Sequence, residues 1–159
     1  MGTHGKKIVD LNLKNLISLL NKALADEWLA YYQYWVGALV VKGPMAERIK
    51  AELEEHATEE FKHANMLAAR ILQLGGTPIL EYKDLARLST CGFIAPKNPA
   101  GTAILKQNIK GEQCAITVYA KLLKLTEGKD ILTHLMLQEI LKEEVEHEDD
   151  LENLLEDLS

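Results

Sequence analysis

Apolar residues recur along the chain in four long stretches at steps of three and four positions, the spacing of one buried face of an α-helix. The stretches run from about Leu11 to Val41, from Pro44 to the Gly75-Gly76 pair, from Asn98-Pro99 to about Gly128, and from about Asp130 almost to the C-terminus. At 1.5 Å per residue each helix would be about 40–48 Å long, which is typical of helix bundles. The pattern therefore predicts an all-α fold.

The links between the four stretches predict how the helices are arranged. The first and last links are short, so each joins two helices into an antiparallel hairpin. The middle link, about residues 76–98, is long enough to return along the bundle and place the third helix parallel to the second. A short helix is expected inside it, over Glu81 to Leu88. The prediction is a four-helix bundle of two antiparallel hairpins joined by a long crossover.

The ends of the chain and of the helices carry further expectations. Residues 1–159 are predicted to form a single domain, with a short disordered segment at residues 1–8. Pro44 and Pro99 are both expected in a first helical turn, where proline is tolerated. Asn98 would then cap the third helix.

Polar residues replace apolar ones near the middle of every predicted stripe. The order is the same in both hairpins: a glutamate, a tyrosine seven positions later, and then Glu-x-x-His. In the first hairpin these residues are Glu27, Tyr34, Glu60 and His63, and in the second they are Glu112, Tyr119, Glu144 and His147. This duplication in register places polar groups where they can meet inside the bundle.

The duplicated pattern predicts a site for two metal ions. A buried carboxylate without a partner costs several kcal/mol, and four carboxylates together repel each other. Two divalent cations would balance four carboxylates and leave the histidines neutral. Carboxylate and imidazole ligands suit iron or manganese. The expected ligands are Glu27, Glu60, His63, Glu112, Glu144 and His147. The hydroxyls of Tyr34 and Tyr119 are expected to hold ligating carboxylates in place by hydrogen bonds.

Chance alone would also place glutamates on solvated helix faces, and a single Glu-x-x-His is weak evidence for a metal. The repeat on four apolar stripes favours the metal site. Glu59, Glu143 and Glu146 are predicted to be exposed neighbours, and His4 and His134 surface residues. His56 shares the buried stripe of Glu60. It is expected to be a satisfied core histidine, with a role beside the metals as the alternative.

The two cysteines lie at the crossover and on the third helix. Cys91 is in the crossover, and Cys114 comes two positions after Glu112. A step of two residues turns about 200° around a helix, so Cys114 is not expected to point at the metals. The spacing leaves two interpretations open: a redox-active pair close to the metals, or two unrelated buried thiols.

Charge and hydropathy exclude some classes of function. The net charge of -6 disfavours non-specific DNA binding. The longest mostly apolar run, from Trp28 to Val41, is short for a membrane span. The N-terminus lacks the apolar segment of a secretory signal. A cytoplasmic location is expected.

Taken together, these residues resemble the ferritin superfamily over nearly the whole chain. The segment ALADEWLAYYQYW is similar to the first helix of bacterioferritins, and EEFKH, Glu112 and EEVEH match the di-iron ligands of that family. Phe61 stands where bacterioferritins have their haem-ligating methionine, so haem is not expected. The chain ends soon after His147, without the fifth helix of 24-subunit ferritins.

With the cysteine pair, the pattern resembles the Dps-like proteins called thioferritins. That resemblance implies a ferritin-like fold, a hollow dodecamer, and two iron ions per subunit, with manganese as the alternative metal. It also implies that hydrogen peroxide or O2 oxidises Fe(II), that Fe(III) mineral is stored, and that the cell is protected from oxidative stress. DNA coating is not expected at this net charge.

Three other functions fit parts of the pattern. A rubrerythrin-like peroxidase would use the same ligands without storing iron, but rubrerythrins usually carry a cysteine cluster that two cysteines do not supply. A manganese catalase would release oxygen from peroxide. A non-enzymatic shell protein would need the apolar stripes but would leave the duplicated glutamates, tyrosines and histidines unexplained.

Overall fold

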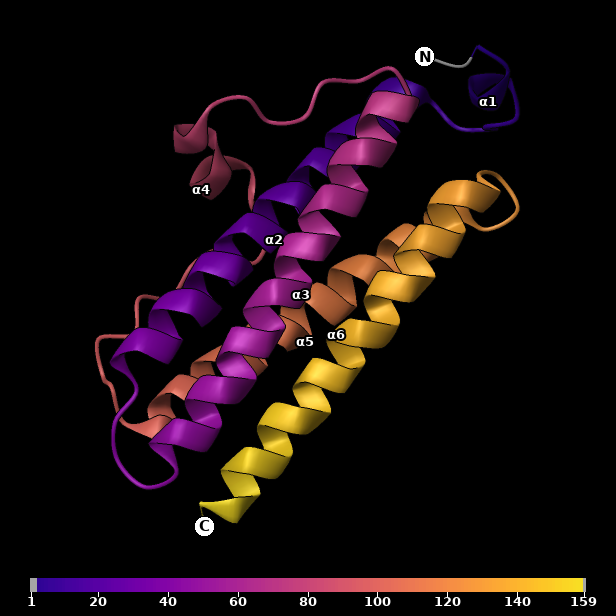
Figure 1. The fold of residues 1–159 in the computed structure, drawn as a ribbon. Coiled ribbons are helices and arrows are strands. Elements are labelled where there is room, and N and C mark those ends of the chain that lie inside the picture. The colour runs from indigo at the N-terminus through magenta and orange to yellow at the C-terminus, as the bar shows by residue number, and fades with distance from the viewer. Residues whose placement is uncertain (1–2, 159) are drawn as a thin grey trace.

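The computed structural model describes residues 3–158, and these form an all-helical bundle (Figure 1). Its four long helices are α2 (Leu13–Val40), α3 (Ala46–Gln73), α5 (Gly101–Thr126) and α6 (Ile131–Asp157). Each lies within one of the four predicted stretches, so the all-α prediction is confirmed. Within residues 3–158, no helix combines the length and the apolar character that crossing a lipid bilayer requires.

The long helices form two antiparallel hairpins. α2 packs mainly on α3, and α5 packs mainly on α6. In Figure 1, α3 and α5 both run upward, so they are parallel as predicted. The second hairpin begins beside the turn of the first, because Lys42 N donates to Pro99 O at 2.8 Å and Gly101 N donates to Lys42 O at 3.2 Å.

The crossover between α3 and α5 contains the short helix expected within residues 81–88. A 3-10 turn, η1 (Tyr82–Asp84), leads directly into α4 (Leu85–Leu88). The side chain of Leu85 is buried with Ala25 and Leu29 of α2. This contact fixes the crossover along α2.

The core has two apolar clusters with a polar layer between them. One cluster includes Leu20, Ile71 and Leu137, and the other includes Ile49 and Leu151. The glutamates of the duplicated pattern lie between the two. The apolar clusters close both ends of the polar layer, so its charges are held away from bulk water.

Both predicted proline positions at helix starts are wrong. α3 begins after Met45, which has a left-handed backbone (φ 58), so Pro44 lies in the preceding turn. α5 begins after Ala100, so Pro99 and Asn98 precede it, and the Asn98 side chain accepts a hydrogen bond from Ala100 N at 3.1 Å. For Pro99 the reason is a long-range contact, because the backbone hydrogen bonds with Lys42 hold residues 99–101 extended.

The short disordered segment expected at residues 1–8 stays a prediction. His4–Lys7 forms one helical turn, α1, and residues 1 and 2 lie outside the described part of the chain. Just after it, Val9 and Leu11 pack against the core, and Asp10 N donates to Lys129 O at 2.8 Å. These contacts anchor residues 9–11 to the core and to the turn between α5 and α6.

The start of α6 is fixed by a buried ion pair. Asp130 caps the helix by accepting from Thr133 N, and Arg70 of α3 donates to both of its carboxylate oxygens at 2.8 and 3.0 Å. Burial alone would raise the pKa of Asp130, but hydrogen bonds from Thr133 and Arg70 lower it below its ordinary value. The pair ties α6 to α3, the two helices that carry Glu-x-x-His.

Candidate metal centre

The six predicted ligands meet in the polar layer at the middle of the bundle. All are at most 3 % exposed: Glu27, Glu60, His63, Glu112, Glu144 and His147. Every long helix contributes at least one of them. The structure therefore brings together the complete set that the sequence singled out.

The ligand atoms form two adjacent groups. In each group, one atom from every side chain lies within 4.8 Å of the others. The first group is Glu27, Glu60, His63 and Glu144, and the second is Glu60, Glu112, Glu144 and His147. Because Glu60 and Glu144 belong to both, the arrangement can hold two cations side by side with two shared carboxylates.

Unsatisfied atoms show that the residues fit metal ions. Each side chain has one buried atom without a hydrogen-bond partner: Glu27 Oε2, Glu60 Oε1, His63 Nδ1, Glu112 Oε2, Glu144 Oε1 and His147 Nδ1. These atoms face one another, with His63 Nδ1 3.1 Å from Glu144 Oε1 and His147 Nδ1 3.4 Å from Glu60 Oε1. Each such atom costs about 1–3 kcal/mol. Two bound cations would satisfy all six.

The electrostatics of the cluster reflect the same need for positive charge. Burial raises the pKa of Glu27 and Glu144 well above the ordinary value, and the charge of Glu60 raises both further. Burial would also raise the pKa of Glu60, but close polar contacts with Glu27, His147 and His63 lower it. Burial would lower the pKa of His147, whereas Glu112 and Glu60 raise it to about 12. In the metal-free protein, bound protons therefore neutralise part of the negative charge of the glutamates, which cations would otherwise neutralise.

The two tyrosines hold glutamates of the opposite hairpin. Tyr34 donates to Glu112 Oε1, and Tyr119 donates to Glu27 Oε1. A tyrosine seven residues from its own hairpin's glutamate lies about 10 Å further along the helix, too far to reach it. The predicted hydrogen bonds to ligating carboxylates are present, and they link the two hairpins across the centre.

Two glutamates that were predicted to be exposed neighbours support the histidines instead. His63 Nε2 lies 2.7 Å from Glu143 Oε2, and His147 Nε2 lies 2.7 Å from Glu59 Oε2. Each pair fixes an imidazole with Nδ1 toward the centre. Glu146 is exposed as predicted. The missed signal was the duplication itself, since a second glutamate precedes the ligating one in both EEFKH and EEVEH.

We expect Glu143→Gln to weaken metal binding about 10–100-fold, because the amide is a poorer acceptor for the His63 ring N–H than the carboxylate. The affinity for Co(II) can be measured by competition with a chromophoric chelator. Glu139→Gln removes a charge from the same face of α6 at a side chain that contacts Lys62 but not His63. Equal affinities in the two variants would contradict the support role of Glu143.

Two further histidines differ from their predicted surroundings. His56 is 2 % exposed, as expected for a core residue, but its Nδ1 has no hydrogen-bond partner, so it is not satisfied. His134 is half-buried rather than at the surface, with Nδ1 3.1 Å from Thr126 Oγ1. It lies in the first turn of α6, where its contact with Thr126 at the end of α5 explains the partial burial.

A cavity of about 130 Å³ reaches the centre from the side of α2, α5 and the crossover. Its lining includes all four glutamates of the centre together with Cys91 and Ile94 of the crossover, but neither His63 nor His147. Gln33 holds this wall by accepting from Ile94 N at 2.8 Å and donating to Asn108 at 3.0 Å. The cavity therefore exposes carboxylate groups of the centre to a small molecule.

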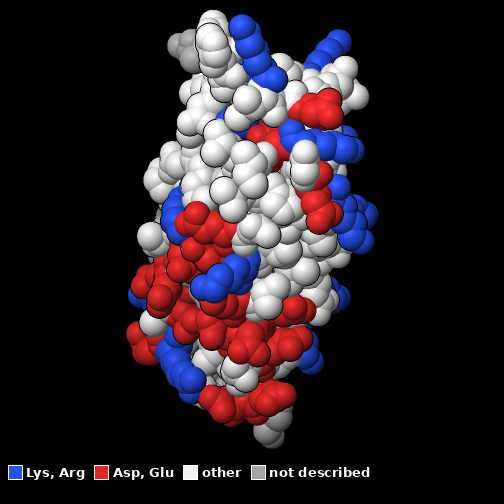
Figure 2. All heavy atoms as spheres, turned by 90° about the vertical axis from the view of Figure 1, so that its right-hand side faces the viewer, with Lys and Arg blue, Asp and Glu red and all other residues white. Residues whose placement is uncertain are grey.

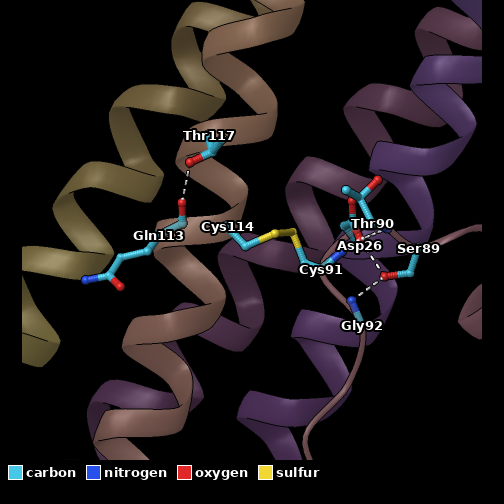
Figure 3. The surroundings of a disulfide bond; sticks show 8 residues. All are labelled: Asp26, Ser89, Thr90, Cys91, Gly92, Gln113, Cys114 and Thr117. Carbon is cyan, nitrogen blue, oxygen red and sulfur yellow. Dashed lines mark hydrogen bonds between the residues drawn. A yellow bond between two sulfur atoms is a disulfide. The ribbon is translucent and has the colours of Figure 1, made fainter.

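The cysteines are joined beside this cavity. Cys91 and Cys114 form a disulfide with Cα atoms 5.7 Å apart (Figure 3). Asp26 of α2 accepts hydrogen bonds from Thr90 N and Cys91 N, both at 2.8 Å. Of the two interpretations that the spacing left open, the structure has the bonded pair between crossover and third helix, and its redox activity stays a prediction. Asp26 is next to Glu27 in α2, and Cys114 is on α5. The crossover around the disulfide therefore connects α2 with α5, two helices that contribute residues to the centre.

Phe61 is placed on the outer side of the first hairpin. Its ring packs against Trp28 and Tyr31 with centroids 5.6 and 6.0 Å apart, and it is 45 % exposed. A phenyl ring has no atom that can ligate haem iron. The absence of haem stays a prediction.

Comparison with known proteins identifies the family. The profile of the ferritin-like domain matches residues 17–159. The chain belongs to the ferritin-like family. The ferritin-like chain is 34% identical over 159 residues to the DNA protection during starvation protein of Pyrococcus furiosus, covering 98% of this chain and 86% of that protein. It is 30% identical over 138 residues to the bacterioferritin of Rhodobacter capsulatus, covering 86% and 80%.

A solved structure is more similar still. The dodecameric thioferritin of Bacteroides fragilis, a bacterioferritin-related protein, superposes with a TM-score of 0.97 at 45% identity, covering 99% of this chain and 95% of that one. The predicted resemblance of this ferritin-like chain to Dps-like thioferritins is confirmed, and so is the ferritin-like bundle.

Proposed function

We propose that the chain binds two Fe(II) ions at the six-residue centre, oxidises them with hydrogen peroxide or O2, and stores the Fe(III) product. The observation that carries this proposal is the pair of four-residue groups sharing Glu60 and Glu144, with an unpaired buried atom on every side chain. Iron storage and oxidative protection are functions of the family to which the chain belongs.

Two adjacent Fe(II) substrate ions suit peroxide as the oxidant. Hydrogen peroxide takes up two electrons to give two hydroxide ions, and two Fe(II) ions supply one electron each. The protein's own groups position these ions: Glu60 and Glu144 would contact both, and Glu59 and Glu143 orient the imidazoles. The cavity at α2 and α5 gives a small oxidant access to the carboxylates.

We propose further that copies of the chain assemble into a hollow shell of twelve subunits, as the Bacteroides fragilis relative does. Support comes from an aromatic group on α2 and the crossover. Tyr32, Trp35 and Phe93 are 39–44% exposed, and the ring of Tyr32 contacts the other two. Apolar groups of this kind mark protein–protein contacts. A cytoplasmic location stays a prediction of the sequence.

The test is to add Fe(II) to the protein without oxygen, then peroxide, and to measure iron retained per assembled particle after gel filtration. We expect retention far beyond the two ions that each centre can hold. Retention of only two per subunit would overturn storage and favour a peroxidase that uses an external electron donor. Release of oxygen from peroxide by the Mn(II)-loaded protein would favour a catalase instead.

A further inference from the structure

His56 is a buried imidazole that belongs to neither central group. It lies on α3 one turn before Glu60 and is 2 % exposed. Its ring stacks on the ring of His147 with centroids 4.1 Å apart, and its Nδ1 has no hydrogen-bond partner. The nitrogen through which this buried ring can bind a ligand is the other one, Nε2, which faces carboxylates of α3 and α6.

Two carboxylates face the other nitrogen of this ring. His56 Nε2 lies 3.4 Å from Glu52 Oε1 and 3.8 Å from Asp150 Oδ2. Both distances exceed the usual N–H···O range. They resemble the spacing of donors around one small cation, because ligand atoms about 2.0–2.1 Å from a tetrahedral ion lie about 3.3 Å apart. One atom from each of the three side chains lies within 4.8 Å of the others.

The surroundings of these residues are strongly acidic. Figure 2 shows carboxylates gathered over the lower half of the face that α6 presents, where the C-terminal part of α6 lies. The basic residues on the adjoining turn of α3 are paired elsewhere, Arg48 with Asp157 at 2.7 Å and Lys50 with Glu54 at 3.9 Å. The negative charge around His56 therefore favours a cation.

We propose that Glu52, His56 and Asp150 form a third metal site, for a divalent transition-metal ion such as Fe(II), Zn(II) or Co(II). One imidazole and two carboxylates are a donor set that these borderline ions accept. Asp150 is 51% exposed at its side chain, so the site opens to solvent and leaves room for water as a fourth ligand. His56 separates this site from His147, and the site does not depend on the proposed oxidation.

The experiment is to bind Zn(II) to the assembled protein and to locate it in crystals by anomalous scattering. Zinc bound in solution is counted in parallel after equilibrium dialysis. We expect a zinc ion bound by His56 Nε2 in the wild type, and its loss in the double variant Glu52→Gln with Asp150→Asn. The zinc bound per chain should fall by one. No zinc near His56 in the wild type, or zinc retained there in the double variant, would overturn the site.

A matched control shows whether zinc binding depends on Glu52 and Asp150 in particular or only on the negative charge of this surface. Glu55→Gln with Asp149→Asn removes the same charge from the same two helices at exposed positions. This control should keep the zinc at His56, and its loss there would also overturn the proposal. Zinc at His56 without zinc at the central glutamates would instead count against the proposed di-iron centre and leave the third site standing.

Discussion

Replacing Glu60 with alanine is expected to lower the initial rate of Fe(II) oxidation by at least about 100-fold, because residues that merely support a metal ligand already contribute about 10–100-fold. Glu60 belongs to both four-residue groups, so its loss removes a donor from both cation positions. The rate is measured by stopped-flow absorbance of Fe(III) after anaerobic loading and addition of peroxide. Glu60→Ala combined with His63→Ala should abolish the rapid phase.

Glu146→Ala is the control for this experiment. It removes a carboxylate from the same EEVEH segment as Glu144, but its side chain is exposed and pairs with Lys142 at 3.0 Å. Its oxidation rate should match the wild type. The metal-free Glu60→Ala protein should melt below the wild type, because the lowered pKa of Glu60 means that the folded state stabilises its charge beside the two imidazoles. Rapid oxidation that survives in Glu60→Ala would place the reaction elsewhere.

Breaking the disulfide is expected to lower the melting temperature by roughly 6–12 °C, from a loss of roughly 3 kcal/mol of stability. Cys91 and Cys114 are 23 positions apart in sequence, and closing a loop of this size restricts the unfolded chain. Differential scanning calorimetry of the wild type with and without reductant measures the effect. Cys91→Ser should melt like the reduced wild type.

The role of the disulfide in the reaction is tested in the same proteins. Cys91 lines the cavity that leads to the glutamates, so breaking the disulfide should change the rate of Fe(II) oxidation by peroxide. The double variant Cys91→Ser with Cys114→Ser serves as the reference, since reductant should no longer affect its melting or its rate. If Cys91→Ser leaves both quantities at their wild-type values, the cysteines have neither a structural nor a redox role.

The helices and the meeting of the six central residues were predictable because their signals are local and repeated. A helix face is set by steps of three and four residues, and Glu60 with His63 interrupts such a face just as Glu144 with His147 does. The repeat removed the ambiguity that a single Glu-x-x-His leaves. The reciprocal tyrosine bonds follow from the same register once the hairpins are antiparallel.

The supporting glutamates could not be placed in this way. Glu59 and Glu143 are one position from a ligand, which turns them about 100° from the buried stripe onto the flank of the helix. Whether a flank meets a neighbouring helix or water depends on the packing of α3 against α6, and no local pattern encodes it. The same holds for Pro99, whose segment is drawn into pairing with Lys42.

The path of the crossover is likewise a long-range property. Cys91 reaches Cys114 because Asp26 and Gln33 bind backbone N–H groups of residues 90, 91 and 94. These acceptors lie more than 60 positions earlier in the chain. From spacing alone, a bonded pair and two separate thiols were equally consistent.

The centre forms only where the two hairpins meet, because Glu60 and Glu144 each belong to both four-residue groups. Each four-residue group takes three residues from one hairpin and its fourth from the other: Glu144 completes the first group and Glu60 the second. The two hairpins therefore contribute in equivalent ways, each supplying three residues to one group and one residue to the other. A single hairpin could therefore build the whole centre by pairing with a copy of itself, and in the present chain the crossover turns that encounter between two molecules into an intramolecular one.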